Sequence, residues 1–277
     1  MNPHPFTEIK IGVPTKHKKG AAIAKGFQEY IKVNIEEVDV DTDLLGTFAG
    51  EVEREGSPYE TAFKKTELVT NYDYVIASEG SIGSDNFVPF LISDFEILIF
   101  RDFRRNLVIK EAHRSFEIKA ARKEISAGEK FDDFLIKADF PNHSVIVKGL
   151  DLKLIAPFKG LRDLESLNKA IFETAKHSAR IILENDLRAN QSPSRMANIE
   201  FTARKLAQRI VALCESCQTP GFGVKRYEKG VICEECKRLN PDAVSREING
   251  CQVCDYEEVG AYINQGLTPD KCIWCNP

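Results

Sequence analysis

Eight cysteines, arranged as four C-x-x-C pairs, are the residues of this chain whose types and spacing most clearly specify a chemistry. All of them lie in its last quarter, at Cys214, Cys217, Cys233, Cys236, Cys251, Cys254, Cys272 and Cys275. Two residues between cysteines let both thiolates of a tight turn face one cation, and two such turns complete the tetrahedral set that zinc prefers. The spacing therefore predicts two zinc ions, each held by four thiolates.

The order in which the four pairs combine follows less directly from the sequence. Fifteen residues separate the first pair from the second, and seventeen separate the third from the fourth. Both gaps are usual for a four-cysteine zinc site, which favours pairing in sequence order. An interleaved cross-brace, first pair with third and second with fourth, stays open but needs longer crossings. Four disulfides are the remaining alternative. Because thiolates fill every ligand position, we expect structural ions with no open place for water.

A basic turn near the N-terminus suits an anion. Residues 8–13 have the pattern of a buried strand, a polar turn with Thr15, His17 and Lys19 follows, and an amphipathic helix begins after it. Strand, basic turn and helix in this order bring backbone N–H groups and lysines to one spot, which predicts a phosphate or carboxylate site. The alternative is a solvated loop that is merely basic.

Carboxylates in two later loops could provide oxygen ligands for Mg²⁺. Asp41, Asp43 and Glu51 surround a glycine-containing loop after the second expected strand, and Glu79 lies in a Gly-rich turn that ends the strand 72–77. Mg²⁺ prefers a few protein carboxylates together with water and substrate phosphate. Such turns at strand ends are also where α/β sheets place ligands. Solvated acidic loops, with Glu79 capping a turn, are the alternative.

A third polar segment joins two expected helices. It holds Asp186, Arg188, Asn190 and Arg195, and Ser192-Pro193 starts the second helix. These side chains could order an anion at the N-terminus of that helix, where the helix dipole adds to the attraction. Alternatively, Asp186 and the arginines brace one another and fix the connection.

Alternating strands and helices predict a mixed α/β sheet domain over 1–158. Apolar residues from Leu164 to Ile182 then predict one long amphipathic helix, and a second carries Ile199 to Leu213 into the first zinc cysteine. We therefore expect a helical hairpin over 159–213, packed on the first domain, and a small two-zinc knuckle or ribbon module over 214–277. A module of that size has too little core to fold without metal.

Composition limits the class of protein. The chain of 277 residues is 43% hydrophobic and 29% charged, which is typical of a globular protein. Its first residues lack the features of a signal peptide and no run is long enough to span a bilayer, so we expect a cytoplasmic protein without membrane contact. A net charge of -4, with seven Lys/Arg against ten Asp/Glu in 214–277, makes RNA the less favoured partner.

Seven short motifs resemble a bacterial family known as domain of unknown function 6671, over nearly the whole chain. They are Thr15-x-His17-x-Lys19, Asp41-Thr42-Asp43-x-x-Gly46-Thr47-Phe48-x-Gly50-Glu51, Ala77-Ser78-Glu79-Gly80-Ser81-x-Gly83, Phe140-Pro141-x-His143, Asp186-x-Arg188-Ala189-x-x-x-Pro193-x-Arg195-Met196, Pro220-Gly221-Phe222-Gly223 and Cys275-Asn276-Pro277. The family name implies no activity. The first half also resembles the inosine/xanthosine triphosphate pyrophosphatases, with the turn at Pro14–Lys19 in the place of their triphosphate loop. Lys16 or His17 replaces the asparagine of that loop.

Two functions follow as hypotheses. The first is a zinc-stabilised, Mg²⁺-dependent hydrolase of a nucleotide or another phosphorylated small molecule. In it Lys19, His17 and Thr15 hold phosphate, while Glu79 with Asp41, Asp43 or Glu51 holds Mg²⁺, and Arg188 and Arg195 stabilise the leaving phosphate. The second is a non-catalytic zinc module that binds a protein partner or RNA through its basic and aromatic residues.

Overall fold

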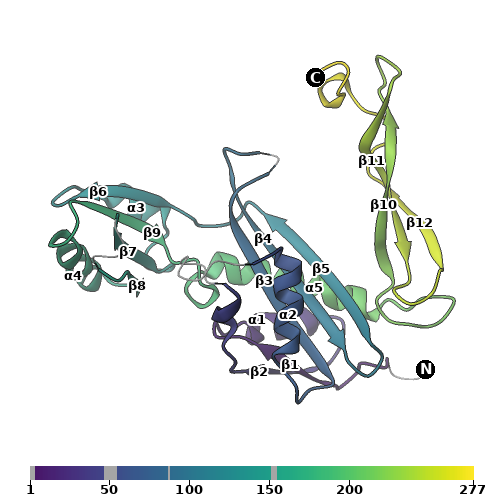
Figure 1. Cartoon of the computed structure of the whole chain (residues 1–277), viewed down its shortest axis with the longest axis horizontal. Coiled ribbons are helices and arrows are strands. Elements are labelled where there is room, and N and C mark those ends of the chain that lie inside the picture. The colour runs from purple at the N-terminus through teal and green to yellow at the C-terminus, as the bar shows by residue number, and fades with distance from the viewer. Residues whose placement is uncertain (1–3, 47–54, 87, 151–154) are drawn as a thin grey trace.

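The computed structural model describes the whole chain except residues 1–3, 47–54, 87 and 151–154 and the side chain of Asp43. Figure 1 shows three parts in a row: a small sheet with two helices on the left, a larger sheet with its helices in the centre, and a narrow ribbon on the right. The mixed α/β architecture with a C-terminal cysteine-containing module is therefore confirmed. No helix in the described part is both long and apolar enough for a bilayer.

The central sheet positions most of the polar residues discussed below. Its strands are β1 (Lys10–Pro14), β2 (Asn34–Val38), β3 (Tyr74–Ser84), β4 (Ile92–Asp102) and β5 (Leu107–Ser115), in the order β2-β1-β3-β4-β5. Strand β1 runs parallel to both β2 and β3, whereas β4 and β5 are antiparallel additions. The chain therefore passes from β1 to β2 on one side and then crosses back over β1 to β3 on its other side.

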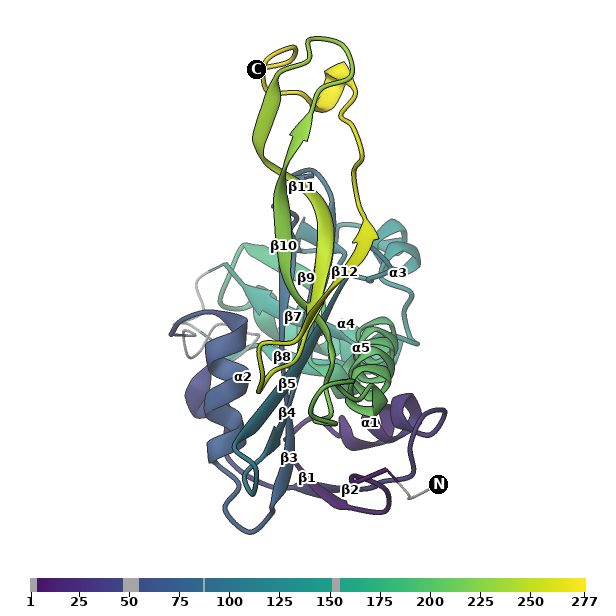
Figure 2. The same ribbon diagram turned by 90° about the vertical axis from the view of Figure 1, so that its right-hand side faces the viewer.

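Helices cover both faces of this sheet (Figure 2). Helices α1 (Gly20–Phe27) and α5 (Pro193–Val211) enclose the main core, in which Phe27 and Leu206 pack with Leu98 of β4. Helix α2 (Pro58–Glu67) covers the other face and begins with a capping box, in which Ser57 and Glu60 bond each other's backbone N–H. Alternate residues of β3 and β4 thus face α5 or α2.

A second, antiparallel sheet has the order β6-β9-β7-β8 and carries α3 and α4. The elements are β6 (Arg122–Ser126), α3 (Asp132–Lys137), β7 (Val145–Gly149), β8 (Phe158–Leu161), α4 (Leu164–Ala175) and β9 (Arg180–Asn185). Its core contains Phe134, Val147, Leu167 and Leu183.

The predicted long helix from Leu164 to Ile182 is wrong. Helix α4 ends at Ala175, and residues Arg180–Asn185 form the central strand β9 instead. Ile181 and Leu183 alternate into the core of the small sheet with the two-residue period of a strand, whereas the predicted helical stripe ends at Ile182 between them. Helix α4 packs on β7 while α5 packs on α1, so the two helices do not pair as a hairpin.

The C-terminal part is a long, twisted ribbon. It consists of β10 (Gly223–Ile232), β11 (Leu239–Gly250) and β12 (Glu257–Tyr262), paired antiparallel in that order. Short 3₁₀ turns lie at η1 (Thr42–Leu45), η2 (Ala189–Gln191) and η3 (Pro269–Lys271). The ribbon projects away from the central sheet, and the cysteines gather at its two ends (Figure 2).

Candidate functional site

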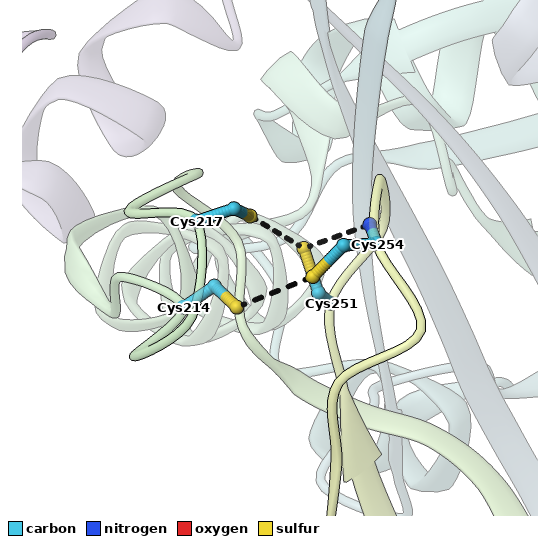
Figure 3. Close-up of side chains that lie close together, drawn as sticks. All are labelled: Cys214, Cys217, Cys251 and Cys254. Carbon is cyan, nitrogen blue, oxygen red and sulfur yellow. Dashed lines mark hydrogen bonds between the residues drawn. The ribbon is translucent and has the colours of Figure 1, made fainter.

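The eight cysteines form two compact sets of four, and none of them is in a disulfide. Within each set the four sulfur atoms all lie within 4.8 Å of one another. In the first set, Cys217 Sγ lies 3.5 Å from Cys251 Sγ and Cys214 Sγ lies 3.7 Å from Cys254 Sγ (Figure 3). A tetrahedral zinc with Zn–S bonds of about 2.3 Å requires sulfurs about 3.8 Å apart. Both sets therefore fit structural zinc.

The favoured pairing in sequence order is wrong, because the sets are interleaved. The first holds Cys214, Cys217, Cys251 and Cys254, and the second holds Cys233, Cys236, Cys272 and Cys275. The reason lies in β10, whose ten residues separate the first pair from the second by about 33 Å of extended chain. Strand β11 returns the chain to the first pair, and the segment after β12 leads to the second. The ribbon therefore has a base site and a tip site.

Backbone and side-chain N–H groups support the sulfurs. The N–H groups of Val253 and Cys254 donate to Cys251 Sγ at 3.3 and 3.4 Å. At the tip, Trp274 N–H and Asn240 Nδ2 donate to Cys272 Sγ at 3.4 and 3.5 Å. Burial by itself raises the pKa of Cys272, but these N–H donors outweigh it and lower that pKa to about 6. The N–H donors thus favour the thiolate form of Cys272, whereas the neighbouring sulfurs raise the pKa of Cys275 in the same set.

A second polar site lies beyond the carboxyl end of β1, beside the part of β3 that continues to Ser84. The expected Gly-rich turn after residue 77 is wrong, because Glu79 lies inside β3. Strand β1 connects to β2 on one side and pairs with β3 on the other, and open α/β sheets bind ligands beyond the carboxyl end of such a strand. Lys19 reaches into this position, and its Nζ donates to Ser78 Oγ at 2.9 Å. Lys65 of α2 meets Glu79 at 2.5 Å. All four side chains are buried.

A fully buried ion pair completes this group from the α5 side. Arg195 and Glu96 are both without exposed side-chain surface, and Arg195 Nε donates to Glu96 Oε1 at 2.6 Å. Arg195 Nη1 also donates to the carbonyl of Leu187 at 2.8 Å. Gly80 makes this approach possible, since a Cβ there would lie 2.4 Å from Glu96 Oε1 and 2.6 Å from Arg195 Nη2. We call Lys19, Lys65, Glu79, Glu96 and Arg195 the switch-point cluster.

Asp94 lies two residues before Glu96 on β4, on the same face of the sheet, and extends the cluster. Its Oδ2 accepts a 2.8 Å hydrogen bond from Asn198 Nδ2 of α5. Burial raises the pKa of this carboxyl to about 7, and the neighbouring Glu96 carboxylate adds to the effect. Asp94 is thus about half neutral at pH 7, and the cluster holds a proton that can be released near neutrality.

The cations of the cluster also perturb one another. Burial lowers the pKa of Lys19 to about 7, with a further contribution from the positive charge of Arg195. Burial alone raises the pKa of Glu79, but Lys65 and Lys19 outweigh it and hold that pKa below its usual range. An anion placed beside Lys19 would restore its charged form, because an opposite charge favours the ammonium ion.

The predicted site residues are only partly brought together. Lys19, Glu79 and Arg195 meet in the switch-point cluster. Thr15 is buried at the start of the turn, and its Oγ1 accepts from the His17 backbone N–H at 3.0 Å. Asp41 lies outside the cluster and pairs with Lys16 at 2.5 Å. The Asp43 side chain and Glu51 lie outside the described part of the chain.

Arg188 lies in a different place from Arg195. Its guanidinium forms a salt bridge with buried Asp186 at 2.5 Å, and Gly160 N–H donates to the same carboxylate at 3.0 Å. Arg188 lines a cleft of about 340 Å³ between the two sheets, together with Ile82 and Lys148. Arg188 thus braces Asp186 within the segment before α5, as the second alternative expects. Arg195 instead pairs with Glu96 in the switch-point cluster.

Sequence reasoning missed Lys65, Glu96 and Asp94. A usable signal existed in the segment Ser93-Asp94-Phe95-Glu96-Ile97, where carboxylates alternate with apolar residues inside an otherwise buried strand. Alternation places Asp94 and Glu96 on the core face, and a buried carboxylate requires a partner. Lys65 carries no such signal, since it sits among ordinary helix charges.

Among the described residues, the groups of three or more His, Cys, Asp or Glu side chains that could hold a metal are the two cysteine sets alone. Glu79 is engaged by two lysines, and Asp41 is bound to Lys16. These two carboxylates therefore do not fit a magnesium site.

Three comparisons with known proteins bear on this chain. A curated relative, archaeosine synthase of Methanocaldococcus jannaschii, is 24% identical over 203 residues, which cover 73% of this chain and 28% of that protein. The chain thus spans little more than a quarter of its length. The crystal structure of protein VC0702 from Vibrio cholerae, with 12% identity and a TM-score of 0.28, covers 39% of this chain and 64% of its own. The family model Domain of unknown function (DUF6671) matches residues 63–277, and the chain belongs to that family.

Proposed function

We propose that the protein binds a nucleotide beyond the carboxyl end of β1, beside β3, and hydrolyses its phosphate chain. The switch-point cluster carries this proposal. It brings buried Lys19, which follows β1, and buried Lys65 of α2 close to Glu79 of β3, with Arg195 of α5 beside them. With Lys19 protonated and Asp94 neutral, the three cations exceed the carboxylates of Glu79 and Glu96 by one positive charge. A phosphate is the ligand that such an excess attracts at this point of the sheet.

The chemistry of the cluster suits a phosphate better than a neutral ligand. Lys19 is about half protonated at pH 7 because its pKa is about 7. A bound phosphate would raise the pKa of Lys19, so that Lys19 becomes fully protonated and positively charged beside the ligand. Preorganised cations in a buried site stabilise developing negative charge without reorganisation. Lys19 and Arg195 are therefore the residues that would assist departure of a phosphate.

The nucleoside part of the proposal rests on the relative. Archaeosine synthase is by its name an enzyme that makes a nucleoside, and it shares 24% identity with most of this chain. The inosine/xanthosine triphosphate pyrophosphatases, which the first half resembles, point to the same class of substrate. We therefore propose a nucleotide as the ligand in preference to other phosphorylated small molecules.

Thermal unfolding of the zinc-loaded protein with a panel of nucleoside mono-, di- and triphosphates tests the binding step. A ligand at one hundred times its dissociation constant stabilises the folded state by about 2.7 kcal/mol. Lys19→Met keeps the length of the side chain and removes its charge, so it should abolish the shift. Lys25→Ala is the matched control, because Lys25 lies on the same helix but is exposed and pairs with Glu200.

Affinity should also fall as pH rises from 6 to 9, because Lys19 loses its proton in that range. Phosphate release from the nucleotide that binds best then tests the reaction, with Mg²⁺ added rather than removed, since chelators would also take zinc from the cysteines. Absence of a shift with every nucleotide, or an equal shift in Lys19→Met, would contradict the proposal.

A further inference from the structure

A large groove lies on the other side of the molecule, between the base of the ribbon and the free edge of the central sheet. It measures about 870 Å³, and its walls come from α2, β5, α5 and the start of β10. Three aromatic rings and three lysines line it. We call this surface the ribbon groove and define it by Tyr59, Lys110, Lys205, Phe222, Lys225 and Tyr227.

The aromatic rings are available along the groove. Tyr227 is 53% exposed, and it alternates with Lys225 along β10 so that both line the groove, while Arg226 between them does not. Phe222 lies nearby and contacts Tyr256 with ring centroids 5.8 Å apart. On the opposite wall, Lys110 Nζ lies 4.2 Å from the centre of the Tyr59 ring. Rings and ammonium groups are thus interleaved on both walls.

The groove is locally positive in a chain whose net charge is -4. Its lining includes Lys110, Lys205, Arg209 and Lys225 against two carboxylates, Glu111 and Glu247, a difference of two positive charges. Glu111 is also neutralised by Arg209 at 2.9 Å and Lys205 at 3.4 Å. Lys225 pairs with Glu257 at 3.5 Å on one wall, and Lys110 lies against the Tyr59 ring on the other. A phosphate would therefore compete with Glu257 for Lys225.

An extended peptide is the obvious alternative occupant, because β5 is an edge strand. Two cationic side chains already occupy that edge. Lys205 Nζ donates to the carbonyl of Ala112 at 2.6 Å, and Arg209 Nη1 donates to the carbonyl of Lys110 at 3.2 Å. The Lys205 and Arg209 side chains thus lie across this part of the edge, where an added strand would have to displace them. They disfavour strand addition.

We propose that the ribbon groove binds single-stranded nucleic acid, with bases stacked on Tyr227 and Tyr59 and phosphates beside Lys110 and Lys225. Aromatic platforms combined with a positive groove are the usual means of holding single strands. This site is separate from the switch-point cluster and does not depend on the nucleotide reaction. RNA and DNA share the chemistry that it recognises, and the experiment distinguishes between them.

Fluorescence anisotropy on the zinc-loaded full chain, with labelled ten-nucleotide RNA and DNA strands of the same mixed sequence, tests the proposal. Two phosphate contacts predict a slope of about -1.4 in log K against log salt, hence an affinity about 7-fold weaker at 200 mM than at 50 mM salt. Lys110→Ala should reduce the slope by about 0.7. Tighter binding of RNA or of DNA identifies the source of the ligand.

Tyr227→Ala should weaken binding about 5- to 150-fold, the range that corresponds to the loss of one stacked base. Tyr262→Ala is its matched control, because Tyr262 is similarly exposed on the same ribbon but does not line the groove. Zinc content of each variant confirms that the ribbon is intact. Absence of binding to both strands, equal binding of a duplex, or unchanged binding by Tyr227→Ala would each overturn the proposal.

Discussion

Two double substitutions in the cysteine module separate the interleaved arrangement from pairing in sequence order. Cys217 lies 34 positions before Cys251, with which it shares the base site, whereas Cys233 belongs to the tip site. The variant Cys217→Ser/Cys251→Ser therefore damages one site and should retain one zinc ion per chain. The variant Cys217→Ser/Cys233→Ser damages both sites and should retain none. Each variant loses two thiolates including that of Cys217, so each controls for the other.

The energetic consequence follows from the length of chain that the base site closes. Closing a loop of 34 residues costs about 4 kcal/mol of loop entropy, which zinc binding at the base site must outweigh. Structural zinc supplies about 10–16 kcal/mol in small domains, so loss of the base site should lower the stability of the ribbon by about 6–12 kcal/mol. Zinc released by acid, measured with a colorimetric chelator, gives the stoichiometry, and limited proteolysis reports the loosening of the ribbon.

Pairing in sequence order predicts the opposite pattern. Cys217 and Cys233 would then share a site, so their double variant would retain one zinc ion, and the Cys217/Cys251 variant would retain none. That outcome would refute the arrangement in Figure 3 and the reasoning from β10 behind it.

Two further predictions concern the switch-point cluster. Folded Asp94, with its pKa of about 7, keeps a proton between about pH 4 and 7 that the unfolded chain releases, so the free energy of unfolding should fall as pH rises through that window. Asp94→Asn should remove this fall and be more stable than wild type at pH 8 by up to about 4 kcal/mol, measured by urea unfolding at pH 5 and pH 8; equal pH dependence of the two proteins would contradict it. Gly80→Ala should lower the free energy of unfolding by about 1–3 kcal/mol, because its methyl group would collide with Glu96 and Arg195. An unchanged urea midpoint would contradict this close packing.

Local signals in the sequence predict the elements whose residues all lie close along the chain. The capping box at Ser57 and Glu60 and the turns of the C-x-x-C pairs are of this kind. Strand β9 was missed because its apolar run, residues 181–183, is short, and its pairing depends on two strands that are distant in sequence. Periodicity in a single short segment cannot replace that information.

The candidate site shows the same limit. Lys19 could be predicted because it follows β1 in a turn, a pattern that points to the carboxyl edge of a sheet. For Glu79 the same prediction had a wrong basis, since its Gly-rich segment continues β3 to Ser84. Their partners Lys65 and Glu96 come from elements whose relative placement only the fold specifies. The predicted pairing of the cysteines was wrong for a related reason. The first two pairs are close in sequence, but the extended strand β10 holds them apart in space.

The interleaved zinc sites have a consequence for the order in which the chain is made. Synthesis produces Cys214, Cys217, Cys233 and Cys236 before any partner in the third or fourth pair exists. These four thiols belong to different native sites, yet a loop of 16 positions between them closes with less entropy loss than the native loop of 34. A zinc ion captured at that stage sits between the wrong pairs and must be released before the ribbon can form. Correct loading is therefore a matter of timing, in which late delivery of metal produces the native ribbon directly and early delivery requires an exchange step.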